Sequence, residues 1–134
     1  MKRFHDAQRY DYPIALEEVC RGRKNSHWMW YIFPQLKGLG RSETAHYYGL
    51  DGLEEARLYA ADPVLIGNLR QITQALLDQP ERNPRIVFGG TDTWKLRSCM
   101  TLFELVDPDC ALYARVLEEF FGGKRDHMTL DLIK

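Results

Sequence analysis

Basic side chains recur in this sequence beside glycines or just before a predicted helix, where proteins commonly bind phosphate. Four segments share this arrangement: Arg23 and Lys24 before Ser26; Lys37 and Arg41 around Gly38 and Gly40; Lys95 and Arg97 after Gly89 and Gly90; Lys124 and Arg125 after Gly122. Glycines let backbone N–H groups approach a ligand, helix N-termini are partly positive, and arginine adds a bidentate fork. The pattern therefore predicts a phosphorylated ligand.

The segment KGLGRS, residues 37–42, fits this chemistry best. It is neither a P-loop nor a dinucleotide fingerprint, because its lysine precedes the glycines and no strand precedes them. Two interpretations stay open. Arg41 and the Ser42 amide form an anion cradle in the first, whereas the second is a glycine-rich connector that ends at a helix capped by Ser42.

Aromatic residues stand beside these cations in the segment SHWMWYIFP, residues 26–34. We expect Trp28 to pack in the core, as large aromatic side chains usually do. Trp30 is the candidate for a pocket wall, because an accessible indole stacks on a base or a sugar. The predicted ligand-binding residues are Arg23, Lys24, Ser26, His27, Trp30, Gly38, Gly40, Arg41, Ser42, Lys95, Arg97 and Ser98.

The residues considered for acid–base catalysis are Glu43, Glu104, His27 and His46. On a helix over residues 92–106, Arg97, Thr101 and Glu104 share one face at spacings of four and three. Such a face could hold a phosphate beside a general acid or base, and the alternative is an ordinary solvated surface. A single histidine on an amphipathic helix, such as His46, is more often a packed or surface residue than a catalyst. Neither a Ser/His/Asp order nor a metal-ligand spacing occurs, so we predict no metal and no cofactor.

Composition narrows the class of protein. The chain has 134 residues, the usual size of one domain, and its 18 Lys and Arg nearly balance its 19 Asp and Glu. A balanced charge argues against binding to nucleic acid or an anionic membrane. The three cysteines lie in apolar helical patterns without metal spacing, which indicates buried thiols in a reducing cytosol. The N-terminus is polar and no apolar run could span a bilayer, so we expect a cytoplasmic protein.

Helical periodicity runs throughout, so these residues must be positioned by helices: we predict an all-α fold of seven or eight helices in one domain, residues 1–134. The expected helices span 11–21, 27–33 after a Ser26 cap, 43–48, 53–61 after an Asp51 cap, 63–79, 92–106 after a Thr91 cap, 108–121 and 126–133, with a turn at 83–88. The longest carries Leu65, Leu69, Ile72 and Leu76 as an apolar stripe.

The segments GRKNSHWMWYIFPQLKGLGRS, YYGL, LEEARLY, KLRSCMTLF and FFGG resemble the small helical bacterial family called domain of unknown function 1810. The resemblance extends from Phe4 to Ile133 and implies a multihelical single domain, but no activity. Some members carry the label calpastatin. That label is not transferred, because inhibitors of that name are disordered and proline-rich, whereas this chain has a dense apolar pattern.

A fainter resemblance connects SETAHYYGLDGLEEARLYAADP and WKLRSCMTLFELV with the NADAR proteins, all-helical enzymes that cleave ADP-ribose N-glycosidic bonds. It implies functional positions at Glu43, His46, Tyr47, Lys95 and Met100. The spacing of Glu43 and His46 departs from the adjacent pair of that family. The chemistry implied by this resemblance matches the residue patterns: cations for phosphates, aromatics for a base or ribose, and a carboxylate to activate water.

Three functions follow as hypotheses. The first is a pocket for a phosphorylated nucleotide or ADP-ribose-like molecule, with N-glycosidic hydrolysis as an added activity; it requires the basic segments to meet in one cavity containing a carboxylate. A protein-interaction or regulatory module, including a homodimer, is favoured if Trp and Phe are contiguous on the surface without a polar pocket. Binding to RNA or single-stranded DNA is disfavoured by the balanced charge and would weaken steeply with salt.

Overall fold

Nine helices make up the regular structure of the chain, whose computed structural model describes residues 1–134. They are α1 (Lys2–Cys20), α2 (Met29–Ile32), α3 (Glu43–Tyr48), α4 (Gly52–Ala61), α5 (Pro63–Asp78), α6 (Pro84–Phe88), α7 (Gly90–Val106), α8 (Leu112–Phe121) and α9 (His127–Leu132). The all-helical prediction is confirmed, but the count of seven or eight was too low. The segment expected to form a turn at 83–88 forms the short helix α6.

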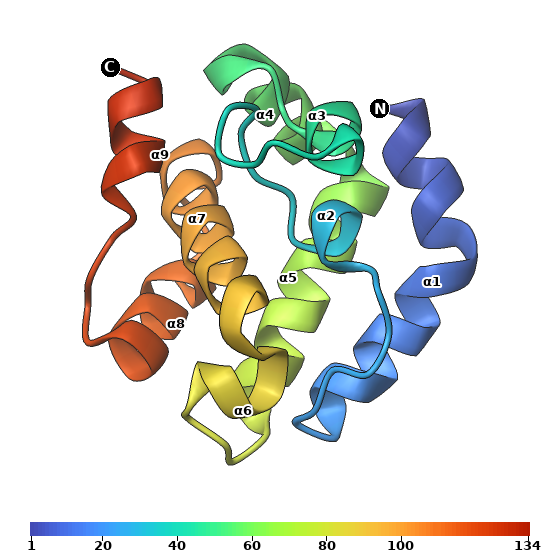
Figure 1. Cartoon of the computed structure of the whole chain (residues 1–134), viewed down its shortest axis with the longest axis vertical. Helices are drawn as coiled ribbons and strands as arrows, with labels where there is room; N and C mark the ends of the chain where they lie inside the picture. Colours follow the sequence, from blue (N-terminus) through green and yellow to red (C-terminus); the bar gives the residue numbers. More distant parts are fainter.

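The helix α5 lies between α1 and α8 and contacts both of them as well as α4 (Figure 1). Its start follows local chemistry: the Asp62 side chain accepts hydrogen bonds from the Val64 and Leu65 N–H groups, and Pro63 stands in the first turn. The predicted stripe of Leu65, Leu69, Ile72 and Leu76 is buried. The inward face of α5 therefore joins the one hydrophobic cluster of 28 buried residues.

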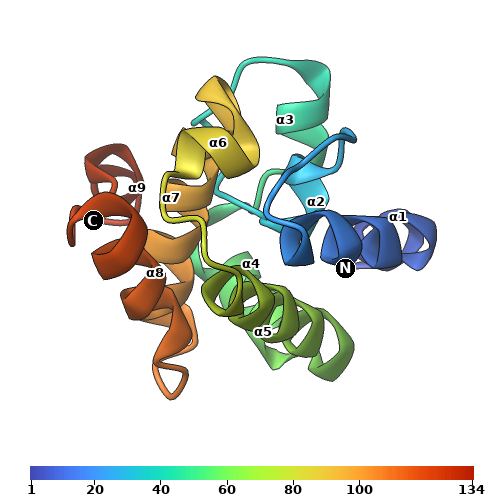
Figure 2. The same ribbon diagram turned by 90° about the horizontal axis from the view of Figure 1, so that it is seen from below.

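The second long helix, α7, organises the remaining elements. It packs against α2, α4, α6, α8 and α9. Figure 2 shows α2 and α3 on one side of α7 and α8 and α9 on the other. Residues from α2, α3 and the segment before them can therefore meet the side chains of α7, and this junction holds the site described below. No helix combines the length and the apolar character needed to cross a bilayer.

Two predicted helix starts at the N-terminal end were wrong. The helix α1 begins at Lys2 rather than residue 11, and Pro13 lies inside it. Phe4 and Gln8 give the polar N-terminal segment an inward face that continues to Ala15 and Val19, so tertiary packing outweighs the helix-breaking effect of proline. The helix α2 is limited to four residues and starts after Trp28, without a side-chain cap.

Later boundaries also differ from the prediction. The helix α7 begins at Gly90 with Gly89 as its N-cap, so Thr91 lies inside the helix instead of capping it. The helix α8 begins at Leu112, because the chain first turns after Asp107, whose carbonyl accepts a hydrogen bond from the Cys110 N–H. Asp51 makes no side-chain cap; its own N–H donates to Glu55 at 2.9 Å.

The cysteines were predicted to be buried, and only Cys99 is. Cys20 is exposed and Cys110 is half-buried. Both stand where a helix ends or has not yet begun, Cys20 as the last residue of α1 and Cys110 two residues before α8. The apolar periodicity around them thus does not continue into the core.

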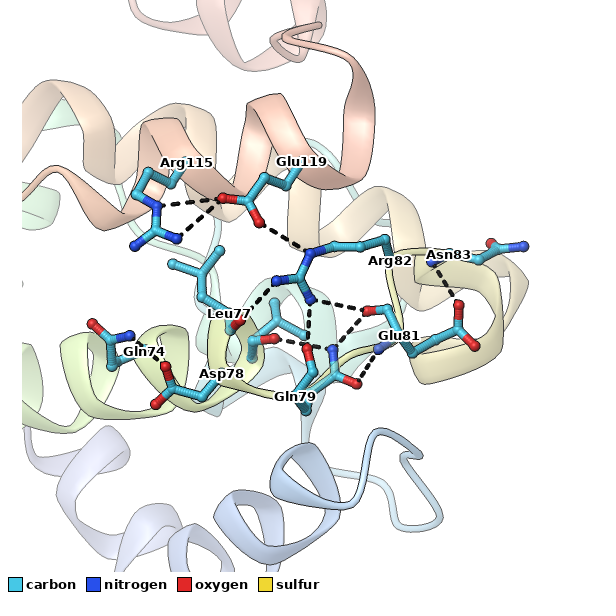
Figure 3. A network of polar contacts seen from close by, with 10 residues as sticks. Gln74, Leu77, Asp78, Gln79, Glu81, Arg82, Asn83, Arg115 and Glu119 are labelled. Carbon is cyan, nitrogen blue, oxygen red and sulfur yellow. Dashed lines mark hydrogen bonds and ion pairs between the residues drawn. The ribbon is translucent and has the colours of Figure 1, made fainter.

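The corner between α5 and α6 is closed by a dense polar network (Figure 3). Arg82 donates to the Leu77 carbonyl at 2.7 Å and to Glu119 of α8 at 3.0 Å. Gln79, which is 5% exposed, donates from Nε2 to the Leu76 and Glu81 carbonyls and accepts from the Glu81 N–H. Each amide and guanidinium drawn here has a hydrogen-bond partner within the protein, so the polar groups of this corner have a structural role.

Candidate ligand-binding site

Two lysines from distant segments meet around one carboxylate where the loop before α2 crosses the start of α7. Lys24 Nζ lies 2.8 Å from Asp92 Oδ2, and Lys95 Nζ lies 2.9 Å from Asp92 Oδ1. They border a cavity of about 310 Å³, which we call the lysine hollow. Its lining residues are Lys24, His27, Trp28, Met29, Trp30, Tyr31, Thr44, Asp92 and Lys95.

The charges in the lysine hollow do not cancel. Burial acts to raise the pKa of Asp92, but hydrogen bonds from Lys24 and Lys95 outweigh burial, so the pKa of this carboxyl is lowered. Asp92 is therefore ionised at neutral pH and balances only one of the two ammonium groups. The three side chains leave one net positive charge in the hollow, which favours an anionic guest.

Each lysine also faces an indole. Lys24 Nζ lies 5.0 Å from the Trp28 ring centroid, and Lys95 Nζ lies 4.0 Å from that of Trp30. Trp28 is only 1% exposed, so the prediction that it belongs to the core is confirmed. Trp30 is half-buried and lines the cavity, which leaves part of its ring accessible. Cation–π attraction holds both ammonium groups near the ring faces.

The segment that carries Lys24 and the two indoles is anchored by Glu18 of α1. This buried carboxylate accepts hydrogen bonds from the Asn25 and Ser26 N–H groups, the Ser26 hydroxyl and Trp28 Nε1. Burial acts to raise the pKa of Glu18, but these hydrogen bonds outweigh burial and lower it to about 2. Ser26, predicted as a helix cap and ligand contact, is instead bound to Glu18.

A second cavity of about 240 Å³ adjoins the first and shares Trp30 and Lys95 with it. We call it the indole hollow, because Trp30 and Trp94 both line it. Its full lining is Trp30, Gln35, Leu39, Gly40, Thr91, Trp94, Lys95, Ser98, Asp126 and Met128. Ser98 was a predicted ligand contact; its Oγ lies 3.0 Å from the Trp94 carbonyl and 3.2 Å from Asp126 Oδ2.

A third, wider hollow of about 670 Å³ lies along the start of α3. It is lined by the predicted residues Gly40, Arg41, Ser42, Glu43 and His46, together with Thr44, Tyr47 and Tyr48. The predicted Ser42 cap is confirmed, because its hydroxyl accepts from the Ala45 N–H at 3.0 Å. Gly40 and Thr44 connect this hollow with the other two, so residues from three of the four basic segments gather in one region.

The two glycines of KGLGRS are required by the structure for different reasons. Gly38 has φ of +96°, a conformation that other residues rarely adopt. A Cβ on Gly40 would lie 2.7 Å from both Ala45 Cβ and Trp30 Cη2. Gly40 is therefore needed for close packing against Trp30, a role that differs from the predicted approach of its backbone to a ligand.

Other sequence candidates lie outside the three hollows. Arg23 is exposed and does not line any of them. Arg97 lies 3.6 Å from Asp126 and stacks on Trp94, while Glu104 pairs with Arg125 at 2.6 Å. The face formed by Arg97, Thr101 and Glu104 thus meets the segment leading into α9. The basic pair Lys124 and Arg125 stays on that side of the molecule.

Sequence reasoning missed Asp92, Gln35 and Trp94. Asp92 had a detectable signal, since it stands three residues before Lys95 on a predicted helix and follows a glycine pair. Trp94 could have been noted as an indole just before two basic residues, Lys95 and Arg97. Gln35 had no signal, because nothing in its neighbourhood distinguishes a buried amide from a surface one.

The fold and the site define an all-helical protein with adjoining cavities lined by lysines, indoles and carboxylates, of which Asp92 is bound by two lysines. The family model described as Protein of unknown function (DUF1810) matches residues 1–133, so the chain belongs to that family. The chain is similar to the conserved hypothetical protein Rv1873 from Mycobacterium tuberculosis, with 39% identity, a TM-score of 0.95 and coverage of 98% of this chain and 94% of that chain. No curated protein matches.

The positions implied by the fainter NADAR resemblance do not all come together. Glu43, His46 and Tyr47 line the hollow at α3, whereas Lys95 lines the other two. Met100 is fully buried in the core. The resemblance itself stays a prediction.

Proposed function

We propose that the protein binds a small phosphorylated molecule of the nucleotide or ADP-ribose class in the lysine hollow. The observation that carries this proposal is the pair of ammonium groups, from Lys24 and Lys95, held on the two oxygens of Asp92. Phosphate oxygens would bind on the open sides of these ammonium groups, and Trp30 would contact the base or the sugar.

The local electrostatics support an anion. The side chains of Lys24 and Lys95 are 8% and 22% exposed, so water screens their charges less than it screens surface lysines. One unbalanced positive charge in a partly closed cavity attracts phosphate more strongly than the same charge on a surface. The whole chain has a net charge of −1, so the positive potential is confined to the lysine hollow. A chain with this net charge does not favour nucleic acid as the partner.

Burial of the aromatic residues favours a small molecule over a protein partner. Trp28, Phe33, Phe88 and Phe103 lie in the core. Trp94, at 47% exposure, is the one Trp or Phe among the exposed large apolar residues, and it borders the indole hollow. The accessible indole surface, from Trp30 and Trp94, therefore borders a cavity, which supports a small-molecule ligand over a protein partner.

Asp92 favours hydrolysis as the accompanying reaction. It is the one carboxylate that lines the lysine hollow, and a general base must lie within reach of the water that it activates. Within this proposal Asp92 replaces Glu43 and Glu104 as the catalytic carboxylate, because neither Glu43 nor Glu104 lines the lysine hollow. In the expected reaction, water attacks the anomeric carbon of an ADP-ribose-like ligand and gives a proton to Asp92, while the N-glycosidic bond breaks and the base leaves with its bonding electron pair.

The test is a thermal-shift screen with ADP-ribose, NAD, mononucleotides, inorganic phosphate and short RNA. A ligand that binds only the native state must raise the melting temperature by mass action. We expect a ligand to raise the melting temperature of the wild type. In Lys95→Gln this increase should be smaller, because the loss of one charge-assisted hydrogen bond weakens binding by about tenfold to a hundredfold. Compounds that bind are then assayed for release of the free base or nicotinamide, with Asp92→Asn as the variant that should lose turnover.

Two control variants locate the ligand. Lys2→Gln removes an 88%-exposed lysine side chain that pairs only with Asp6, so the shift should remain. Arg41→Ala probes the hollow at α3 and should leave most of the shift. The proposal is overturned if no compound moves the wild-type transition, or if Arg41→Ala abolishes the shift while Lys95→Gln leaves it intact.

A further inference from the structure

Gln35 is the exception among the buried polar side chains of this protein. The buried polar and charged residues are Gln8, Glu18, Gln35, Thr73, Gln79, Thr93, Ser98, Thr101, Asp107, Asp126 and Thr129. Each of the others has a side-chain hydrogen bond within the protein, as in the contacts of Gln8 with Tyr31, Tyr59 and Asn68. Gln35 is only 5% exposed, and its amide makes none. A buried amide without a partner is rare enough to require an explanation.

The backbone around Gln35 is held firmly. The Gln35 carbonyl accepts a hydrogen bond from the Leu50 N–H at 2.9 Å, and the Lys37 N–H donates to the Leu50 carbonyl at 2.9 Å. These two bonds form the isolated bridge between Leu36 and Leu50. The position of the Gln35 side chain is thus set by a rigid segment, and the missing partner does not result from a loose loop.

Gln35 lines the indole hollow together with Trp30 and Trp94. The side-chain nitrogens and oxygens that are sealed from contact and lack a partner are Arg3 Nε and Arg97 Nε alone. The amide of Gln35 is not among them, so it keeps access through the cavity that it lines. A guest in this hollow would meet one carbonyl acceptor and two N–H donors.

We propose that the indole hollow binds the base of a nucleotide whose phosphate occupies the lysine hollow, and that Gln35 hydrogen-bonds to the edge of this base. This inference rests on the proposed function and names its ligand more closely. The side-by-side donor and acceptor of a glutamine amide match the paired groups along a base edge, as in bidentate recognition of adenine. Trp30 and Trp94 supply flat apolar surfaces on which a base can stack.

The arrangement of the two hollows fits a nucleotide divided between them. Both contain Trp30 and Lys95, so a ligand can pass from one to the other around these two side chains. The indole hollow, at about 240 Å³, is below the roughly 300–1,000 Å³ typical of a whole ligand site, which suits one part of a larger molecule. The charged part belongs beside Lys24 and Lys95, and the uncharged ring beside Gln35.

The experiment compares ligands that share a phosphate and differ in the base. Isothermal titration would measure AMP, GMP, CMP, UMP and ribose 5-phosphate on the wild type and on Gln35→Met, in which methionine keeps the length of the side chain without its donors and acceptor. We expect at least one nucleotide to bind the wild type about tenfold or more tightly than ribose 5-phosphate. Gln35→Met should lose this advantage and should bind ribose 5-phosphate within about twofold of the wild type.

A second variant keeps the test decisive if Gln35→Met folds poorly. Trp94→Ala alters a side chain that is 47% exposed and removes one stacking surface, so it too should reduce the advantage of the nucleotide over ribose 5-phosphate. The inference is overturned if the wild type binds nucleotides and ribose 5-phosphate equally, or if both variants keep the preference. Binding of ribose 5-phosphate without preference would leave the proposed function standing, whereas no binding of any phosphate would remove both.

Discussion

Gln35 and Gln79 are equally buried, at 5% exposure each, yet the protein uses them in opposite ways. The Gln79 amide donates to the Leu76 carbonyl at 3.0 Å and the Glu81 carbonyl at 2.7 Å, and accepts from the Glu81 N–H at 2.9 Å (Figure 3). The Gln35 amide makes no bond to the protein and lines a cavity. Burial therefore does not reveal the role of a polar side chain, whereas the count of its partners does.

The cations of the same two regions repeat this contrast. Arg82 directs its guanidinium to the carbonyls of Leu77 and Gln79 and to Glu119, which leaves little capacity for a ligand. Lys24 and Lys95 share a single carboxylate and border a cavity. Each ammonium group has three N–H donors, and the donors that Asp92 does not accept can bind a ligand. At the corner after α5 the polar groups are bound to other groups of the protein. In the hollows at α7, polar groups stay available for a ligand.

The largest expected effect is at Glu18, the buried carboxylate with the most partners. Glu18→Gln removes the negative charge that four hydrogen-bond donors face. We expect the free energy of unfolding to fall by about 3 kcal/mol, which is the free energy that corresponds to lowering the pKa of Glu18 to about 2. Urea denaturation measures this change. Glu17→Gln is the matched control, because Glu17 is the preceding residue and its side chain is 70% exposed. Equal effects of the two substitutions would contradict the anchoring role of Glu18.

The same carboxylate predicts a pH dependence. The pKa of Glu18 is lower in the folded protein than in the unfolded chain, so its contribution is complete above about pH 4.5 and is lost as the pH falls towards 2. The difference in unfolding free energy between wild type and Glu18→Gln should therefore shrink across this window. Thermal unfolding at a series of pH values measures it, and a difference that stays constant down to pH 2 would refute the assignment.

The next effect tests the two glutamines directly with one substitution. Gln79→Met should lower the free energy of unfolding by about 2 kcal/mol, because it leaves the Glu81 N–H and the Leu76 carbonyl without the partner that the Gln79 amide supplies. Gln35→Met should change it by less than about 0.5 kcal/mol or raise it, since no protein hydrogen bond is lost. Urea denaturation of both variants without ligand makes the comparison. Similar losses at the two positions would show that Gln35 is structural.

A smaller effect is expected at Gly40, which keeps Trp30 in its place. Gly40→Ala would press a methyl group against Ala45 and Trp30, at a cost of about 1–2 kcal/mol, and should alter the tryptophan fluorescence. Gly67→Ala is the matched control, because no atom lies within 4 Å of the added Cβ in the interior of α5. That control should gain about 0.5–1 kcal/mol from helix propensity. A fluorescence spectrum unchanged in Gly40→Ala would separate Gly40 from the position of Trp30.

Some features were predictable because they depend on neighbours along the chain. The Ser42 cap on α3 and the Asp126 cap on α9 follow from a short polar side chain placed before a helical pattern. The apolar stripe of residues 65–76 follows from a period of 3.6 residues. Ser26 failed as a cap for a non-local reason: Glu18 of α1 binds its hydroxyl and N–H.

The candidate site was predictable only in its residue types. The basic residues and indoles named from the sequence include Lys24, Trp30 and Lys95, which do line the lysine hollow. Their meeting point is Asp92, and the sequence offered Glu43 and Glu104 as carboxylates instead. Spacing along a helix indicates which residues share a face, but it does not indicate which face another segment covers.

The sequence by itself determined the all-helical class, the family, the core position of Trp28 and the kind of chemistry that the basic and aromatic residues can perform. Only the tertiary structure decided that Lys24 and Lys95 share Asp92, that Arg97 turns to Asp126, and that Gln35 is buried without a partner. The physical reason is the distance along the chain over which each interaction acts. Helix periodicity and capping act over a few residues, whereas the pairing of charges and the satisfaction of a buried amide depend on segments that packing brings together from far apart in the chain.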